Sequence, residues 1–252
     1  MTMGVDLSLE ENASTGNAEL PARIERLSPP VTGVHVWWCS LRPSRAALES
    51  REHALSGAER DRAARFGNAL LRERYVMGRG ALREILAAEL GITPSSVEIV
   101  RGVRGRPQLA PPADLDFNVS HTADVAIVGI VRGARIGVDV ERLDRTINVS
   151  GIARKFLSVS ERAALALLDA ESARRRVLTL WTCKEAMSKA TGDALSAPFD
   201  RIDVDLDRGP SLRGGPAPYD PVRWSIHPAA APTEFVATVA LWRHAFETLK
   251  KR

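Results

Sequence analysis

Two carboxylates near the middle of the chain have a spacing suited to binding a cation. Asp139 and Glu141 lie in residues 135–141, where aliphatic side chains alternate with glycine and acids. This period of two predicts a half-buried strand with both carboxylates on one face, roughly 7 Å apart. We expect Gly137 to leave open space beside them. A rigid pair of acids suits a hard cation, although a solvent-facing strand side would explain the two residues alone as well.

A predicted helix further along the chain supplies a third acid. Glu185 and Lys189 are four residues apart and therefore share a helix face, where such a pair is usually only a surface ion pair. Trp181 lies on the same stripe, which indicates that this face meets the core or a cleft. Glu185 would then complete a three-acid Mg²⁺ site with the two strand acids. Lys184 and Lys189 beside it would compensate phosphate charge.

The other candidate residues carry weaker signals. Ser120 and His121 are neighbours on a predicted strand and point to opposite faces, so they cannot act as a nucleophile–base pair. His121 is therefore structural or phosphate-binding. The basic, glycine-broken turn at residues 101–107 lacks the lysine and hydroxyl of a P-loop. Cys183 is expected to be small buried filler.

The totals bound the class of protein. A chain of 252 residues fits one large domain or two halves of ordinary size. It contains no apolar run long enough for a membrane span and no secretory signal pattern. The two cysteines, Cys39 and Cys183, lack metal-type spacing, so we expect a reduced, cytoplasmic protein. The net charge of +4 suggests an anionic partner, and genome composition explains the arginine richness equally well.

Apolar periodicity predicts an α+β fold, because strands cluster centrally with helices on either side. Residues 1–32 are expected to be a disordered N-terminal tail. The expected strands are 34–38, 97–100, 117–121, 125–131, 135–141, 201–206, 222–226 and 233–242, and the expected helices are 58–66, one ending at Leu90, 158–168 and 174–191.

Three blocks together resemble one known family. They are Phe-Asn-Val-Ser-His at 117–121, Gly-Val-Asp-Val-Glu at 137–141 and Trp-Thr-Cys-Lys-Glu-Ala-Met-Ser-Lys at 181–189. Their order and spacing are similar to those of 4'-phosphopantetheinyl transferases. The chain length, the segment 56–66 and Gly105-Arg106-Pro107 resemble the longer, monomeric surfactin-type branch. The resemblance covers about residues 34–206.

The resemblance implies a fold and a reaction. Two similar α/β subdomains, residues 33–133 and 134–247, would be related by a pseudo-twofold axis, with coenzyme A in the cleft between them. The phosphopantetheine arm of coenzyme A would move to a serine of an apo acyl or peptidyl carrier protein, releasing 3',5'-ADP. The implied protein is a cytoplasmic monomer that needs neither nucleic acid nor a membrane.

The resemblance also assigns roles residue by residue. Mg²⁺ would be held by Asp139, Glu141 and Glu185, and Glu185 would help to deprotonate the carrier serine. Lys189 would neutralise or protonate the leaving phosphate, and Lys184 would hold pyrophosphate. The implied coenzyme-binding residues are Arg62 and Arg74 near the 3'-phosphate, Arg106 in the nucleotide pocket, and the pair Ser120 and His121. Two positions depart from the family pattern: Thr122 replaces a usual serine, and Glu59 stands where a basic residue is common.

Two other functions compete with this one. A Mg²⁺-dependent phosphodiesterase or nuclease would use the same acids with water as the nucleophile. A basic nucleic-acid-binding module would have no chemistry and would show steeply salt-dependent binding. Neither accounts for the spacing of Lys184, Glu185 and Lys189 together with the Ser120-His121 block.

Overall fold

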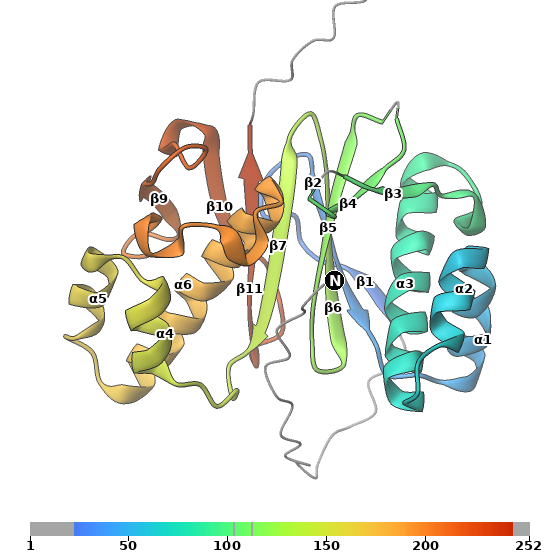
Figure 1. Cartoon of the computed structure of the whole chain (residues 1–252), viewed down its shortest axis with the longest axis horizontal. Coiled ribbons are helices and arrows are strands. Elements are labelled where there is room, and N and C mark those ends of the chain that lie inside the picture. Colours follow the sequence, from blue (N-terminus) through green and yellow to red (C-terminus); the bar gives the residue numbers. More distant parts are fainter. Residues whose placement is uncertain (1–22, 103, 112, 244–252) are drawn as a thin grey trace, which may run out of the picture.

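Two antiparallel sheets pack face to face in the computed structural model, which describes residues 23–102, 104–111 and 113–243 (Figure 1). The first sheet has the order β1-β2-β6-β5, and the second has the order β10-β11-β7. Their strands are β1 (Ile24–Arg26), β2 (Val34–Ser40), β5 (Leu115–Thr122), β6 (Val125–Arg132), β7 (Arg135–Arg142), β10 (Trp224–Pro228) and β11 (Phe235–Trp242).

The space between the sheets is an aliphatic core. The alternation in β7 directs Ile136, Val138 and Val140 into it, where they meet residues of β2 and β6. Gly129 on β6 allows close contact, because a Cβ there would lie 2.5 Å from a methyl group of Val138. The acids of β7 therefore face the opposite side of its sheet.

Each sheet is covered on its outer face by one 22-residue helix. In the first half this helix is α3 (Ala69–Leu90), flanked by α1 (Arg45–Ala54) and α2 (Gly57–Ala64). In the second half it is α6 (Ala170–Thr191), flanked by α4 (Val149–Phe156) and α5 (Val159–Leu165). The long helices end at Gly91 and Gly192, whose φ angles of 69° and 83° favour glycine.

The layers run helix, sheet, sheet, helix across the molecule (Figure 1). This arrangement confirms the predicted α+β class and its two similar halves. The remaining elements are the hairpins β3 (Ile99–Arg101) with β4 (Pro107–Leu109) and β8 (Asp203–Asp205) with β9 (Ser211–Gly214), and the 3-10 turns η1 (Pro94–Ser96), η2 (Ala194–Ser196), η3 (Phe199–Arg201) and η4 (Pro221–Arg223).

The N-terminal prediction needs a correction. Residues 1–32 were expected to be a disordered tail, but strand β1 lies within them. It is held there because β1 pairs with β2 and Ile24 packs against the core between the first sheet and α3. Residues 1–22 of that tail lie outside the described residues. Within the described part of the chain, no helix combines the length and hydropathy needed to cross a membrane.

Candidate active site

The two sheets meet along two edge strands that side chains, rather than a backbone ladder, join together. Asp116 and Asn118 on β5 accept hydrogen bonds from the backbone N–H groups of Ile136 (2.8 Å) and Val138 (3.0 Å) on β7. Two residues further on, Ser120 donates to Asp139 Oδ1 at 2.7 Å. Polar residues at every second position of β5 thus fix its register on β7 and bring Ser120 to the first acid.

Gly137 allows α6 to approach β7 very closely. A Cβ at Gly137 would lie 1.8 Å from the carbonyl oxygen of Ala186. The expectation that this glycine leaves open space beside the acids is therefore wrong, because the backbone of α6 fills that space. This close approach places the Glu185 and Lys189 face of the helix next to Asp139.

Lys189 is the link between helix and strands. Its Nζ lies 2.6 Å from Asp139 Oδ1 and 2.8 Å from Ser120 Oγ. The Asp139 side chain is 7% exposed, so this ion pair is largely shielded from water. The structure therefore brings together four of the predicted site residues, namely Ser120, Asp139, Glu185 and Lys189.

Glu185 has the most perturbed carboxyl group of the cluster. Burial is the main cause that raises its pKa to about 7, the negative charges of Asp139 and Glu141 raise it further, and Lys189 opposes them. Burial, followed by the charge of Asp139, also raises the pKa of Glu141. Arg145, four residues beyond Glu141, lies 2.5 Å from its carboxylate and opposes that shift.

The donor set fits a hard cation, although the side chains are not gathered around one point. Asp139 Oδ2 and Glu185 Oε1 are buried and have no hydrogen-bond partner. Buried carboxylate oxygens without partners are costly, and carboxylates are typical Mg²⁺ ligands. Among the described residues, no three His, Cys, Asp or Glu side chains are already arranged as a metal site. In this structure Lys189 neutralises Asp139 and Arg145 neutralises Glu141 instead.

His121 and Arg74 lie beside this cluster. His121 is on the exposed end of β5, and partial desolvation, followed by the positive charge of Lys189, lowers its pKa; Arg74 lowers it further, and Asp139 opposes them. Arg74 is on α3, and its Nε is buried without a hydrogen-bond partner. An arginine and a histidine are thus both available beside the acids.

Arg62 lines a separate basic cavity of about 160 Å³. Its guanidinium lies 5.5 Å from the ring centroid of Tyr75, and Arg79 and Arg101 form other parts of the wall. Arg79 is partly neutralised by Glu59, at 2.5 Å. Three guanidinium groups around one small cavity are suited to an anion.

The departure at Glu59 has a structural explanation. Its carboxylate accepts a hydrogen bond from the Ser56 backbone and so completes the capping box of α2. It also accepts one from Arg83 at 2.5 Å. Burial acts to raise the pKa of Glu59, but hydrogen bonds from Arg83 and Ser56, together with Arg79, outweigh it and lower the pKa. Glu59 is therefore part of the helix packing.

The prediction that Lys184 holds pyrophosphate is wrong. Lys184 is fully buried, and its Nζ donates to Glu161 Oε2 at 2.6 Å and to the carbonyl oxygens of Phe156, Phe199 and Ile202. Burial lowers its pKa, and Glu161 opposes that shift. Because adjacent helix residues point in different directions, the side chain next to Glu185 enters the core between α6 and the α4–α5 region.

The prediction that Arg106 lies in a nucleotide pocket is also contradicted. Its side chain is 8% exposed and forms a two-pronged ion pair with Asp116, with both distances 2.8 Å. Its guanidinium also donates to four backbone carbonyl oxygens, those of Pro107, Phe117, Ile136 and Lys189. All its N–H groups are engaged within the protein, so none is left for a phosphate.

Sequence reasoning missed three residues that build the site: Asp116, Asn118 and Arg145. The sequence contained a signal for the first two, because polar side chains recur at every second position, at residues 116, 118, 120 and 122. Such a pattern indicates one polar strand face, but local sequence does not say which strand it contacts.

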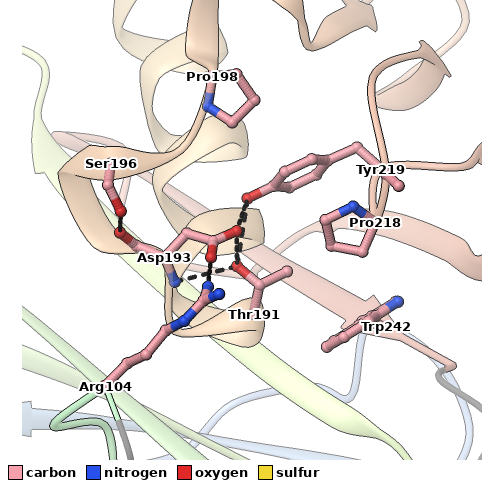
Figure 2. Close-up of a pocket in the computed structure, with 9 residues that line it drawn as sticks. Arg104, Thr191, Asp193, Ser196, Pro198, Pro218, Tyr219 and Trp242 are labelled. Atoms are coloured by element: carbon pink, nitrogen blue, oxygen red, sulfur yellow. Dashed lines mark hydrogen bonds and ion pairs between the residues drawn. The ribbon is translucent and has the colours of Figure 1, made fainter.

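A larger cavity, of about 360 Å³, lies beyond the C-terminal end of α6 (Figure 2). Asp193 is central to its wall, because it pairs with Arg104 and accepts hydrogen bonds from Thr191 and Tyr219, each at 2.8 Å. These polar groups satisfy one another. The cavity contains none of the acids of the candidate site.

Two models of known protein families match this chain. The 4'-phosphopantetheinyl transferase superfamily matches residues 135–240, and the N-terminal domain described as 4'-phosphopantetheinyl transferase, N-terminal, matches residues 38–131.

Several curated proteins are similar along much of the chain. The 4'-phosphopantetheinyl transferase HetI of a Nostoc species is 33% identical over 211 residues, covering 82% of this chain and 87% of that protein. A 4'-phosphopantetheinyl transferase of Bacillus subtilis is 30% identical, covering 66% and 73%. The human L-aminoadipate-semialdehyde dehydrogenase-phosphopantetheinyl transferase is 25% identical, covering 74% and 64%.

Among solved structures, a holo-(acyl-carrier-protein) synthase of Bacillus anthracis, in complex with CoA (3',5'-ADP), overlaps 43% of this chain and 94% of its own. The TM-score is 0.35 and the identity is 24%.

Proposed function

This chain belongs to the 4'-phosphopantetheinyl transferase superfamily, and we propose that it transfers the 4'-phosphopantetheine arm of coenzyme A to a serine of an apo acyl or peptidyl carrier protein. The second product would be 3',5'-ADP. Support for transfer within the site comes from one observation above all: Asp139 Oδ2 and Glu185 Oε1 are buried without partners next to the ammonium group of Lys189. A bound cation would satisfy the two carboxylate oxygens, and phosphate oxygens would accept hydrogen bonds from the ammonium group.

Bond changes in the proposed reaction follow from displacement at phosphorus. The serine oxygen of the carrier forms a bond to the phosphorus that bears the pantetheine, and the bond from that phosphorus to the bridging pyrophosphate oxygen breaks. The serine loses a proton, and the leaving phosphate of 3',5'-ADP gains negative charge. Positioning and charge neutralisation account for catalysis of this kind.

Glu185 is the proposed acceptor of the serine proton. Its carboxylate is buried within the cluster, where a general base must lie within hydrogen-bond reach of the proton that it removes. Lys189 is proposed to neutralise or protonate the leaving phosphate, since its ammonium lies at the same cluster. Both side chains project from α6, whose contact with β7 at Gly137 holds them in place.

Asp139, Glu141 and Glu185 are the proposed Mg²⁺ ligands. When bound, the ion would neutralise pyrophosphate charge. Arg145 would leave Glu141, and Lys189 would exchange its contact with Asp139 for one with phosphate.

Coenzyme A is proposed to extend from this cluster toward α2 and α3. His121 and Arg74 lie beside the cluster, and Ser120 Oγ contacts Lys189, so all three could contact phosphate. The basic cavity lined by Arg62 would suit the 3'-phosphate.

The test follows the fate of the coenzyme. The protein is incubated with coenzyme A, Mg²⁺ and an apo carrier, and 3',5'-ADP is quantified by chromatography. We expect release only with the carrier, and none with a carrier whose acceptor serine is replaced by alanine. Release of the same nucleotide without any carrier would instead indicate a phosphodiesterase that uses water.

A further inference from the structure

Arg106 connects four elements that build the candidate site. It follows the tight turn between β3 and β4, closed by a hydrogen bond from Gly105 N to Gly102 O at 2.8 Å. From there its guanidinium reaches β5 through Asp116, β7 through the carbonyl of Ile136, and α6 through the carbonyl of Lys189. No single element could hold these three together.

The contact with α6 falls on the residue that supplies the site's ammonium group. Lys189 is in the last turn of α6, where carbonyl groups lack helical partners. Arg106 Nε donates to the Lys189 carbonyl at 2.8 Å, and a cation is favourable at this end of a helix. The Arg106 stem also packs on the helix end, because a Cβ at Gly192 would lie 3.8 Å from Arg106 Cβ.

We propose that Arg106 is a positioning residue for phosphopantetheinyl transfer, which holds the backbone of Lys189 so that its ammonium group meets Asp139. This inference rests on the proposed function. In this role Arg106 acts without contacting the coenzyme. Its ion pair with Asp116, which also accepts from Ile136 N, ties the end of α6 to the junction of β5 and β7.

The chemistry of the contacts requires arginine. A guanidinium can donate to two carboxylate oxygens and several carbonyls in a fixed plane, whereas an ammonium group is a compact point charge. A lysine could satisfy a phosphate but could not replace this set of contacts. Arg106→Lys therefore separates a positioning role from a nucleotide-binding role.

The first experiment measures kcat, and KM for coenzyme A, in Arg106→Lys. We expect kcat to fall by about 10–100-fold, because small displacements of a catalytic group are costly, while KM stays within about 3-fold. Full activity in Arg106→Lys, or a rise in KM with normal kcat, would overturn the proposal and restore a nucleotide-binding role.

Arg104→Ala is the matched control. Arg104 is on the same turn and pairs with Asp193, just beyond the end of α6 (Figure 2). Its side chain is 63% exposed, so the pair is expected to contribute little. We expect kcat of Arg104→Ala within about 2-fold of the parent protein. A loss as large as that of Arg106→Lys would show that the turn, not the Arg106 contact, matters.

A second variant avoids leaving a buried charge unpaired. Arg106→Met combined with Asp116→Asn removes both charges and keeps an acceptor for Ile136 N. Combining this pair with Lys189→Ala should lower kcat no further, within about 2-fold, than Lys189→Ala alone. If the kcat losses of the Arg106/Asp116 pair and of Lys189→Ala multiply in the combined variant, Arg106 does not act through Lys189. If the parent protein itself modifies no carrier, the proposed function fails, which is a separate result.

Discussion

The Lys189 ammonium group lies 2.6 Å from Asp139 Oδ1, although the two residues are 50 positions apart in sequence and belong to α6 and β7. Two features produce this contact. Gly137 lets the helix backbone reach the strand, and the polar face of β5 fixes where the strand lies. The site therefore depends on the junction of the two halves, and several consequences can be measured.

Replacing Lys184 tests its corrected role. Lys184→Met leaves the Glu161 carboxylate, whose side chain is 2% exposed, without its cation. Loss of one partner from a buried pair costs about 3–5 kcal/mol. We expect urea denaturation to show a fall of this size in the free energy of unfolding, with KM for coenzyme A unchanged in the folded fraction. Lys184→Met with Glu161→Gln should recover part of the loss. A stable Lys184→Met protein with a raised KM would support the pyrophosphate role instead.

The raised pKa of Glu185 predicts a stability change with pH. Its pKa of about 7 in the folded protein exceeds the ordinary value of 4.5, so the folded state binds more protons than the unfolded state between these values. Stability from this group therefore falls as pH rises from 4.5 to 7 and stays lower above 7. Glu185→Gln should be more stable than the parent at pH 8 by about 1–3 kcal/mol, and similar at pH 4.

Thermal unfolding without divalent metal measures this effect. Glu185→Gln should melt roughly 3–10 °C higher than the parent protein at pH 8. Identical melting temperatures for the two proteins at both pH values would mean that Glu185 ionises normally.

The proposed coenzyme contacts predict a change in KM. Arg62→Ala, Arg74→Ala and His121→Ala should each raise KM for coenzyme A with little change in kcat, because contacts to phosphate groups that do not react stabilise ground and transition states alike. Dephospho-coenzyme A should be a poorer substrate for the parent protein. The arginine variants should discriminate less between the two substrates. Equal use of both by the parent protein would remove the 3'-phosphate assignment.

Charge predicts how the carrier docks. The chain carries a net charge of +4, so it would attract an acidic carrier domain. Opposite charges raise association rates more than affinity, and salt screens them over about 8 Å at physiological ionic strength. We expect kcat/KM for the carrier to fall as salt rises, with a smaller change in KM for coenzyme A. A carrier rate indifferent to salt would rule out charge-guided docking.

Periodicity was enough to predict the elements with strong local signals. The expected helix ends at Leu90 and residue 191 are confirmed, because α3 and α6 end there, each directly before a glycine. Helix α5 begins within the expected helix 158–168, and a capping box of Ser158 and Glu161 fixes its start. Helix α1 was not predicted, because it is largely polar and only Arg51 and Ala54 are buried.

The site was predictable in its residue types but not in its contacts. The β7 alternation and the four-residue spacing on α6 placed Asp139, Glu185 and Lys189 on suitable faces. Which face of α6 meets β7 is decided by Gly137, whose role as a close contact needs the partner element to be known. Lys184 and Arg106 were assigned to the coenzyme by family resemblance, but acids with little exposure, Glu161 and Asp116, bind them within the protein.

The intact mass of an apo carrier, measured after incubation with coenzyme A and Mg²⁺, tests the central claim most directly. With the parent protein we predict the gain of one phosphopantetheine arm on the acceptor serine. With Asp139→Ala or Glu185→Gln, whose folding is checked by circular dichroism, the initial rate should fall by at least about 10²-fold, the scale of a lost general base. An unmodified carrier in the parent reaction, or near-normal rates in both variants, would contradict the account of this site.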